Sequence, residues 1–184
     1  MALKVDKTLR LILLDRDGVI NEDSPDFIRS AAQWLPIPGA IDAITLLQKH
    51  FSVAVCTNQS GIGRGYFDAG TLHQMHQKMN DLIKAAGGQP VDVFFCPHHP
   101  DAGCDCRKPE PGLLRTAMAA QNHKAAHTLY VGDSEKDLLA ADAAGCHAGL
   151  VLTGKGKQTH ATAVGQACKR VEPDLMALAR TLTR

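Results

Sequence analysis

The sequence of 184 residues predicts an α/β fold, a doubly wound parallel sheet of the Rossmann-like type, on three observations. Short apolar runs, each long enough for one buried strand, alternate with segments that have the periodicity of amphipathic helices. Each helical segment leads to another apolar run, as expected for parallel strands joined by right-handed crossovers. Three of the apolar runs end in acidic or hydroxyl side chains, at the position where open α/β sheets bind their ligands.

Length and composition indicate a single domain over residues 1–184. Hydrophobic residues make up 45% of the chain and charged residues 21%, as in ordinary globular proteins. The net charge of +1 creates no basic field, so we expect no nucleic-acid partner. No apolar run has the length of a membrane span, and Met1–Arg10 lacks the core of a signal peptide. We therefore expect a cytoplasmic protein, monomeric and without a membrane partner.

The first expected strand, Leu11–Leu14, ends in Asp15-Arg16-Asp17-Gly18. So short an apolar run could also be a buried helical segment, but Asp-x-Asp-Gly at its end favours a strand followed by a turn. On an extended segment Asp15 and Asp17 can face the same point. Neighbouring carboxylates repel each other unless a cation intervenes, so this pair predicts a Mg²⁺ site. The alternative is a solvated Asp-Gly turn.

The other strands and the helices follow in order. Apolar and β-branched runs identify further strands at Phe51–Cys56, Val91–Phe95, Thr128–Val131 and His147–Leu152. Apolar residues recurring every three or four positions, with Pro, Thr or Gly at the ends, identify the helices. They are expected after Gly39, over residues 71–86 with Thr71 as N-cap, over 111–121, over 138–144 and over 172–182.

Two long segments are expected as loops. Residues 22–36 carry charge, two prolines and no sustained period, which predicts a small flap over the site, too short to be a separate cap domain. Residues 153–166 are rich in Gly, Lys and Thr and are also expected to be a loop.

Polar residues follow two further strands. Thr57-Asn58-Gln59-Ser60 ends the second strand and leads into glycines at 61, 63 and 65, whose amides can hold an anion. A glycine-rich loop alone is a weak signal, but its place at a strand end adds weight. The fourth strand ends in Gly132-Asp133, shortly before Asp137. Because parallel strands end at one edge of their sheet, these groups are expected to lie near Asp15 and Asp17.

Cys96, His98, Cys104 and Cys106 lie within eleven residues. In a reducing compartment such a cluster indicates a metal rather than disulfides, and three thiols with one imidazole fit a tetrahedral structural zinc site. The alternative is a reduced cysteine-rich loop without metal. Arg107 and Lys108 follow directly, either as a solvated basic pair or as a phosphate grip on a rigid loop.

Together these motifs resemble those of the haloacid-dehalogenase-like phosphatases. Asp15-x-Asp17-Gly18 is similar to the first motif of the family, Thr57-Asn58 to the second, Lys108 to the third and Gly132-Asp133-x-x-x-Asp137 to the fourth. The resemblance covers nearly the whole chain, from Leu9 to Leu152. It implies a phosphatase with the fold of that family, a catalytic Mg²⁺ and a structural Zn²⁺.

The resemblance also implies roles for individual residues. Asp15 is the implied nucleophile and Asp17 the general acid and base. Mg²⁺ is expected on Asp15, the Asp17 carbonyl and Asp133, with Thr57 and Lys108 binding the phosphate and Asp137 orienting Lys108 or a metal-bound water. The remaining substrate-binding residues are expected to be Arg16, Asp23, Ser24, Pro25, Asp26, Asn58, Gln59, Ser60, Arg64 and Arg107.

Within the family, residues 15–21, 57–66 and 96–109 are similar to the branch that removes one phosphate from a heptose bisphosphate during synthesis of lipopolysaccharide core precursors. A sugar phosphate is therefore the expected substrate. The alternative is histidinol-phosphate phosphatase, whose relatives tend to have Asp where Ser60 stands and to lack Arg64-Gly65-Tyr66. A non-catalytic phospho-ligand-binding protein would have no use for the acid pair, and a DNA 3′-phosphatase would need a basic field.

Overall fold

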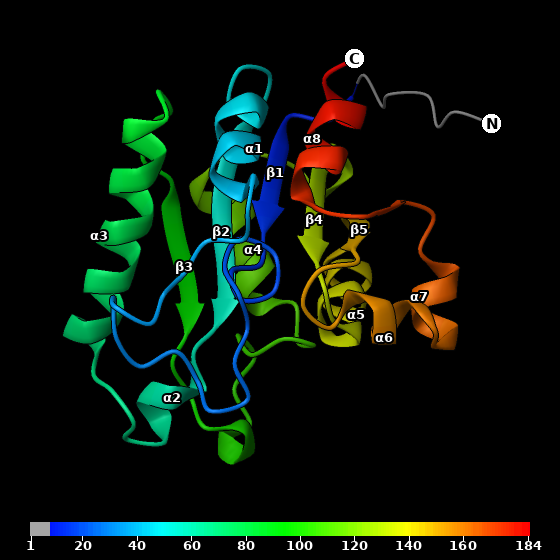
Figure 1. The fold of residues 1–184 in the computed structure, drawn as a ribbon. Coiled ribbons are helices and arrows are strands. Elements are labelled where there is room, and N and C mark those ends of the chain that lie inside the picture. The colour runs from blue at the N-terminus through cyan, green and yellow to red at the C-terminus, as the bar shows by residue number, and fades with distance from the viewer. Residues whose placement is uncertain (1–7) are drawn as a thin grey trace.

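Six parallel strands form one sheet at the centre of the computed structural model, which describes residues 8–184 (Figure 1). In chain order the strands are β1 Leu11–Leu14, β2 Ser52–Asn58, β3 Asp92–Cys96, β4 Thr128–Gly132, β5 His147–Val151 and β6 Val171–Glu172. Their order across the sheet is β3-β2-β1-β4-β5-β6, and every pairing is parallel. The predicted doubly wound parallel sheet is therefore confirmed.

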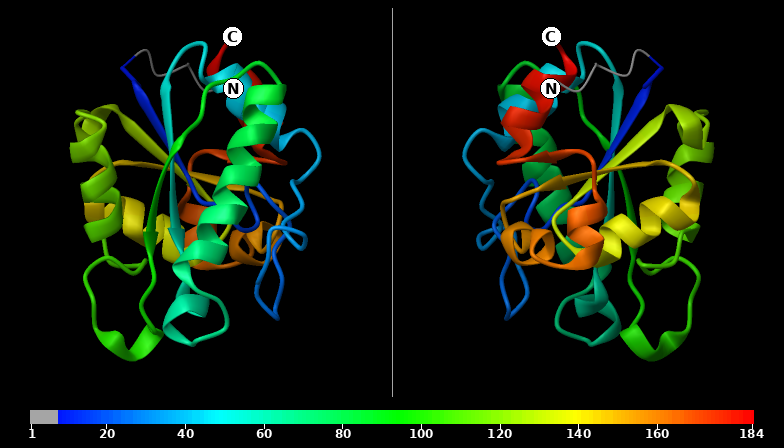
Figure 2. Two further views of the ribbon diagram at one scale, coloured as in Figure 1. Left: turned by 90° about the vertical axis from the view of Figure 1, so that its left-hand side faces the viewer. Right: turned by 90° about the vertical axis from the view of Figure 1, so that its right-hand side faces the viewer.

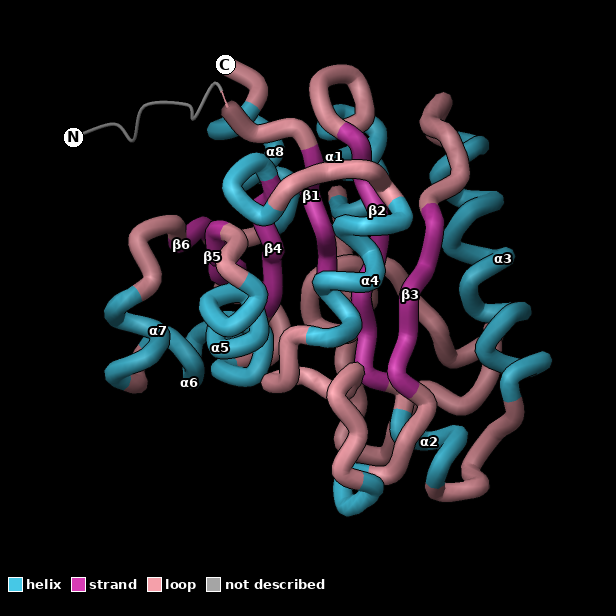
Figure 3. The backbone as a smooth tube through the Cα atoms, turned by 180° about the vertical axis from the view of Figure 1, so that it is seen from behind, coloured by secondary structure: helices cyan, strands magenta, loops and turns pink. Residues whose placement is uncertain are grey.

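Helices cover both faces of the sheet, as Figures 2 and 3 show. On one face lie α1 Ala40–Leu47, α3 Ala69–Ala85 and α8 Leu175–Leu182, and on the other lie α4 Gly112–Ala120 and α5 Glu135–Ala144. Strand β1 contributes to both cores, because Ile12 and Leu14 pack into the first and Leu11 and Leu13 into the second. A strand covered on both faces has to be apolar at every position, which is why its sequence does not alternate.

The strands end together at one edge of the sheet. Leu14 of β1 lies opposite Val55 of β2 and Val131 of β4, so the residues that follow these three leave the sheet side by side. The flap, residues 22–36, and the segment between β3 and α4 extend from this same end of the molecule (Figure 2).

The flap begins and ends at one point. An antiparallel bridge pairs Asn21 with Pro36, and the Glu22 amide donates to the Leu35 carbonyl at 2.9 Å. Trp34 is fully buried beneath the flap. Lys78 of α3 donates from Nζ to the carbonyls of residues 31 and 34, both at 2.7 Å. The second half of the flap is thus fixed to the helical layer.

Several local expectations were wrong. Residues 153–166 are not a loop but contain two short helices, α6 Gly156–His160 and α7 Ala163–Ala167, whose ends are held by hydroxyl groups rather than by an apolar stripe. Residues 60–63 form one helical turn, α2 Ser60–Gly63. Asp68, not Thr71, caps α3, accepting from the Thr71 amide at 2.7 Å. Strand β6 was missed because it has only two residues.

Within the described residues no helix is long and apolar enough to cross a membrane, and no separate cap domain is present. Most of the Met1–Arg10 stretch discussed above, namely residues 1–7, lies outside the described part of the chain.

Helix α8 packs against α1, and its N-terminus is capped by Asp174, the residue that precedes the helix. The Asp174 carboxylate accepts from the Ala177 amide at 2.8 Å and caps the helix. Asp174→Ala should lower the free energy of unfolding by about 1 kcal/mol, because the Ala177 amide in the first turn loses its acceptor. Asp174→Asn, which keeps an acceptor oxygen, should stay within a few tenths of that of the wild type. Urea unfolding of the three proteins measures this, and equal losses in both variants would contradict the cap.

Candidate active site

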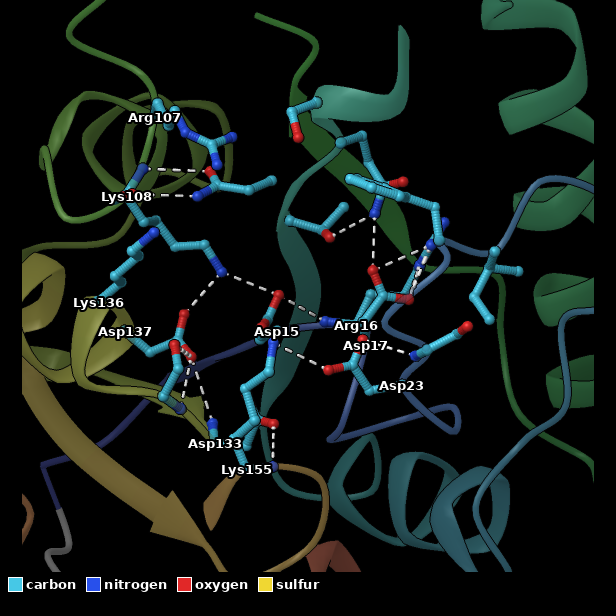
Figure 4. Close-up of a pocket in the computed structure, with 18 of the residues that line it drawn as sticks. Asp15, Arg16, Asp17, Asp23, Arg107, Lys108, Asp133, Lys136, Asp137 and Lys155 are labelled. Atoms are coloured by element: carbon cyan, nitrogen blue, oxygen red, sulfur yellow. Dashed lines mark hydrogen bonds and ion pairs between the residues drawn. The ribbon is translucent and has the colours of Figure 1, made fainter. Parts of the chain in front are cut away.

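A cavity of about 390 Å³ opens at the strand ends, beneath the flap (Figure 4). Among the described residues, all the predicted catalytic and substrate residues line it except Asp26, which is exposed on the flap and turned away. The predicted residues that line the cavity are Asp15, Arg16, Asp17, Asp23, Ser24, Pro25, Thr57, Asn58, Gln59, Ser60, Arg64, Arg107, Lys108 and Asp133.

A buried ammonium organises one side of this cavity. Lys108 Nζ lies 2.8 Å from Asp15 Oδ1 and 2.7 Å from Asp137 Oδ1. Burial lowers the pKa of Lys108, but Asp137 and Asp15 outweigh it and hold the pKa above its usual range. Lys108 therefore stays protonated, and its charge offsets that of the Asp15 carboxylate at the end of β1.

Two elements fix Lys108 in place. Its main chain is held by Asn58, whose Oδ1 accepts from the Lys108 amide and whose Nδ2 donates to the Lys108 carbonyl, both at 3.1 Å. Its Nζ also donates to the Tyr130 hydroxyl at 2.6 Å. Tyr130, on β4, can donate its one proton to the Cys56 carbonyl at 3.0 Å or to Asp137 Oδ1 at 3.1 Å.

Asp137 serves Lys108 and its own helix. Its Oδ2 accepts from the Ser134 hydroxyl at 2.6 Å and the Ser134 amide at 3.0 Å, which closes a capping box at the start of α5. Burial raises the pKa of Asp137, but Lys108 and Ser134 outweigh it and hold the pKa below its ordinary value. Both oxygens are engaged, so Asp137 fits the expected role of orienting Lys108.

Three side chains donate hydrogen bonds to the carboxylate of Asp17. Arg16 donates to Oδ1 and Oδ2 at 2.8–3.1 Å, Asn21 donates to Oδ1 at 2.8 Å, and Gln59 donates to Oδ2 at 3.0 Å. Burial raises the pKa of Asp17, but Arg16 and the Asn21 and Gln59 donors outweigh it and lower the pKa. Without a ligand, Asp17 is therefore ionised.

Arg16 is more deeply buried than a substrate-binding residue needs to be. Only 1% of it is exposed, and its guanidinium is shared between Asp17 and His76, whose Nε2 lies 3.3 Å from Nη1. Burial and the neighbouring Arg16 lower the pKa of His76 to about 3, so its imidazole is neutral. In this arrangement Arg16 orients Asp17.

Asp133 is seated between two glycines. A Cβ on Gly18 or on Gly154 would overlap its carboxylate, and both glycines have positive φ angles, +83° and +53°. Asp133 Oδ2 accepts from the Lys155 amide at 2.8 Å. Burial, with Asp137 adding, raises the pKa of Asp133 to about 7.

The donor set fits a divalent cation. Carboxylate oxygens of Asp15, Asp133 and Asp137 lie within 4.8 Å of one another. Burial raises the pKa of Asp15 well above its ordinary value; Lys108 offsets this in part, while Asp137 and Asp133 add to it. Asp15 Oδ2 and Asp133 Oδ1 accept no hydrogen bond from the described residues, so each can ligate a cation. Crowded oxygen ligands of this kind suit Mg²⁺.

The predicted zinc ligands also come together. His98 Nδ1 lies 3.4 Å from Cys96 Sγ and 3.3 Å from Cys106 Sγ, and the sulfurs of Cys96 and Cys104 lie 3.6 Å apart. Ligands around a tetrahedral zinc are separated by roughly 3.5–3.8 Å, given Zn–S near 2.3 Å and Zn–N near 2.0 Å. All four cysteine and histidine atoms lie within 4.8 Å of one another, and none of the described cysteines forms a disulfide.

Sequence reasoning missed several residues at the cavity. Lys155 binds Asp133 through its amide and reaches Asp23 on the flap with Nζ at 3.0 Å (Figure 4). Its position just after β5 was a usable signal, because ligands gather at strand ends. Tyr130, which contacts Lys108 but does not line the cavity, could have been noticed as a polar group in an apolar strand. Phe27 and Lys136, which also line the cavity, carry no such signal.

The parallel sheet, the acid pair of Asp15 and Asp17, and the buried Lys108 together define a class of protein. A family model described as "HAD-hyrolase-like" matches residues 105–178, which include Lys108, Asp133 and Asp137. The chain is a haloacid-dehalogenase-like hydrolase whose strand ends carry the acids of a phosphatase.

Relatives narrow this class further. The chain is 50% identical over 152 residues to the D-glycero-beta-D-manno-heptose-1,7-bisphosphate 7-phosphatase of Neisseria meningitidis serogroup A, covering 82% of this chain and 81% of the relative. It is also similar to the D,D-heptose 1,7-bisphosphate phosphatase of B. bronchiseptica, whose crystal structure is complexed with magnesium and phosphate. That structure matches with a TM-score of 0.90 at 44% identity, covering 95% of this chain and 98% of the other. The chain belongs to the D-glycero-D-manno-heptose-1,7-bisphosphate 7-phosphatase family.

The close packing of glycine against the Asp133 carboxylate can be tested with matched glycine substitutions. Gly154→Ala places a methyl group against the Asp133 carboxylate, whereas Gly87→Ala, at a φ of +88°, has no atom within 4 Å of the new methyl group. Both variants strain the backbone by about 1 kcal/mol. Only Gly154→Ala should lower phosphatase kcat/KM, by about 100-fold, because Asp133 is displaced. Similar activities of the two variants would mean that the seat of Asp133 does not matter.

Proposed function

We propose that this protein removes the 7-phosphate of D-glycero-D-manno-heptose 1,7-bisphosphate, in the synthesis of ADP-heptose for lipopolysaccharide core. The observation that carries the proposal is Asp15, buried at the end of β1 beside the Lys108 ammonium and opening onto the cavity. The relatives are named for the β anomer, and we extend that anomer to this chain.

Asp15 is the proposed nucleophile. Its carboxylate forms a bond to phosphorus while the bond from phosphorus to the sugar oxygen breaks, which leaves an aspartyl-phosphate. The Arg16 amide and Lys108 Nζ, both 2.8 Å from Oδ1, hold the carboxylate in one orientation. Thr57, buried at the end of β2, and Lys108 donate to the oxygens of the transferred phosphate.

Asp17 is the proposed general acid and base. A phosphate dianion bound beside Asp17 disfavours a second negative charge, and so raises its affinity for a proton. Asp17 can then protonate the leaving sugar oxygen. Once the phosphate is on Asp15, the ionised Asp17 carboxylate, steered by Arg16 and Gln59, accepts a proton from the water that attacks phosphorus.

Mg²⁺ is proposed on Asp15, the Asp17 carbonyl and Asp133. When bound, it would offset the charge of the nucleophile and of the phosphate oxygens, so that two anions can meet. Zn²⁺ is proposed on Cys96, His98, Cys104 and Cys106, where four protein ligands make the site structural. The zinc loop runs directly into Arg107 and Lys108, so its rigidity supports the phosphate grip.

Two cations are free for the phosphate that does not react. Arg107 Nη1 is buried without a hydrogen-bond partner among the described residues. Lys136 stands in the first turn of α5, where the helix dipole opposes a positive charge. Both line the cavity, on the Lys108 side in Figure 4, and a second phosphate between them would satisfy both.

We also propose that the enzyme works in the cytoplasm as a single-domain monomer. Six cysteines without a disulfide suit a reducing compartment. Small-molecule substrate binding beneath a flap of the same chain needs no partner subunit.

Phosphate release from three substrates tests the proposed activity. The wild type should prefer the heptose bisphosphate over histidinol phosphate and over a 3′-phosphorylated oligonucleotide. Asp15→Asn should lower turnover of the bisphosphate by roughly 10⁴-fold or more, because the amide is no nucleophile. Asp42→Asn, on exposed α1 surface, serves as the control and should keep full activity. If the wild type prefers histidinol phosphate, the proposed substrate is wrong and the alternative substrate is correct. If the turnover of Asp15→Asn is within a few-fold of that of the wild type, Asp15 is not the nucleophile.

Metal analysis tests the zinc loop. Protein purified without added metal should carry one equivalent of zinc, since the four ligands form a complete set. Cys104→Ser and Cys106→Ser should each lower zinc content and Tm, while Cys168→Ser, whose thiol lies outside the cluster, should change neither zinc content nor activity. Full zinc content in both loop variants would contradict the site.

A further inference from the structure

The tip of the flap is held by a stack in which two aromatic rings lie between two arginine side chains. Arg29 lies over the Tyr66 ring at 4.4 Å, Tyr66 meets the Phe27 ring edge-on at 5.1 Å, and Arg64 lies over the Phe27 ring at 5.7 Å. Phe27 and Arg29 belong to the flap, whereas Arg64 and Tyr66 belong to the segment between α2 and α3. The two segments therefore interlock through the stack, side chain by side chain.

Other contacts leave this tip without firm support. The Trp34 and Lys78 contacts described above fix only the second half of the flap. At the start of the flap, Asp23 pairs with Lys155, whose side chain is 63% exposed, so that ion pair is screened by solvent. Between these anchors the tip contacts the rest of the described chain through the stack and through the half-buried Ile28, which packs against the core.

Phe27 adopts a conformation that only a specific contact would select. Its φ angle is +64°, in the left-handed region that is rare for bulky side chains. Such backbone strain persists where neighbouring groups over-determine the conformation, and it is concentrated at functional sites. Here the positive φ turns the ring of Phe27 between Tyr66 and Arg64.

The stack is also part of the cavity wall. Phe27 and Arg64 both line the cavity, and no carboxylate of the described residues pairs with Arg64. The Phe27 ring holds the guanidinium carbon of Arg64 by its face, which leaves the N–H donors of Arg64 unused. Those donors can bind hydroxyl or phosphate oxygens of a substrate large enough to reach the flap.

We propose that Phe27 is a positioning residue: with Tyr66 it clamps the flap tip and holds Arg64 as the wall that recognises the non-reacting end of a phosphorylated sugar. This proposal rests on the proposed function for the identity of the sugar. A small phosphate ester that reaches only Asp15 gains little from this wall.

Two substitutions at Phe27 separate the effect of the aromatic ring from the effect of side-chain size. Phe27→Leu keeps an apolar side chain of similar length but cannot hold a cation by its face, whereas Phe27→Tyr keeps the ring. Phe27→Leu should raise KM for the heptose bisphosphate about tenfold and leave kcat within about twofold. The preference for the bisphosphate over p-nitrophenyl phosphate, as a ratio of kcat/KM values, should fall by the same factor. Phe27→Tyr should keep this preference at the wild-type value.

The exposed Leu35 offers a matched control in the same flap. Leu35→Ala removes an apolar side chain that is 56% exposed and lies outside the cavity lining, so the substrate preference should not change. Tyr66→Leu should act like Phe27→Leu. The double variant should lose little more than either single variant, because one clamp is broken either way.

Amide hydrogen exchange tests the clamp without reference to a substrate. Exchange of residues 24–30 should be faster in Phe27→Leu than in the wild type, and unchanged in Leu35→Ala. If the wild type does not use the heptose bisphosphate, the proposed function fails while this result still decides the clamp. Unchanged exchange in Phe27→Leu, or equal losses of kcat/KM on both substrates, would overturn the inference.

Discussion

The charge on Lys108 is the constraint on which the rest of the site depends. This one ammonium connects the loop between β3 and α4 to Asp15 at the end of β1, to the Cys56 carbonyl of β2 and to Asp137 of α5. Removing it would leave two buried carboxylates without a counter-charge, which costs far more than an exposed ion pair is worth. The group proposed to bind phosphate therefore also holds together the strand ends that present the proposed nucleophile.

Much of this arrangement was predictable because its causes are local in the sequence. A strand buried on both faces must be apolar throughout, and the residue after it must be where the sheet ends, so Leu11–Leu14 placed Asp15 correctly. The convergence of Cys96, His98, Cys104 and Cys106 was predictable for a similar reason, since four side chains within one short loop can come together without help from the rest of the fold. Parallel pairing then brought the separate strand ends to one edge.

What the sequence did not reveal depends on contacts between distant segments. Arg16 lines the cavity as expected, but its contact with His76, sixty residues away on α3, is reported by no pattern in residues 11–21. Helices α6 and α7 lack an apolar stripe, and α6 is held partly by the bond from the Thr159 hydroxyl to the Asp133 carbonyl at 2.7 Å. Phe27, whose φ angle is positive, contacts Tyr66 and Arg64, which the sequence alone cannot bring near the flap.

The bridge between Asn21 and Pro36 has a consequence for how such an enzyme can change. Because the flap begins and ends at this bridge and its second half is fixed by Trp34, the first half, residues 23–30, can be lengthened, shortened or exchanged without removing a buried core residue. The groups proposed to break and form bonds to phosphorus, Asp15 and Asp17, lie outside that segment. On the proposed roles, transplanting residues 23–30 from one relative to another, together with the partners of the stack, would therefore transfer preference for the sugar while the chemistry at phosphorus stays where it is.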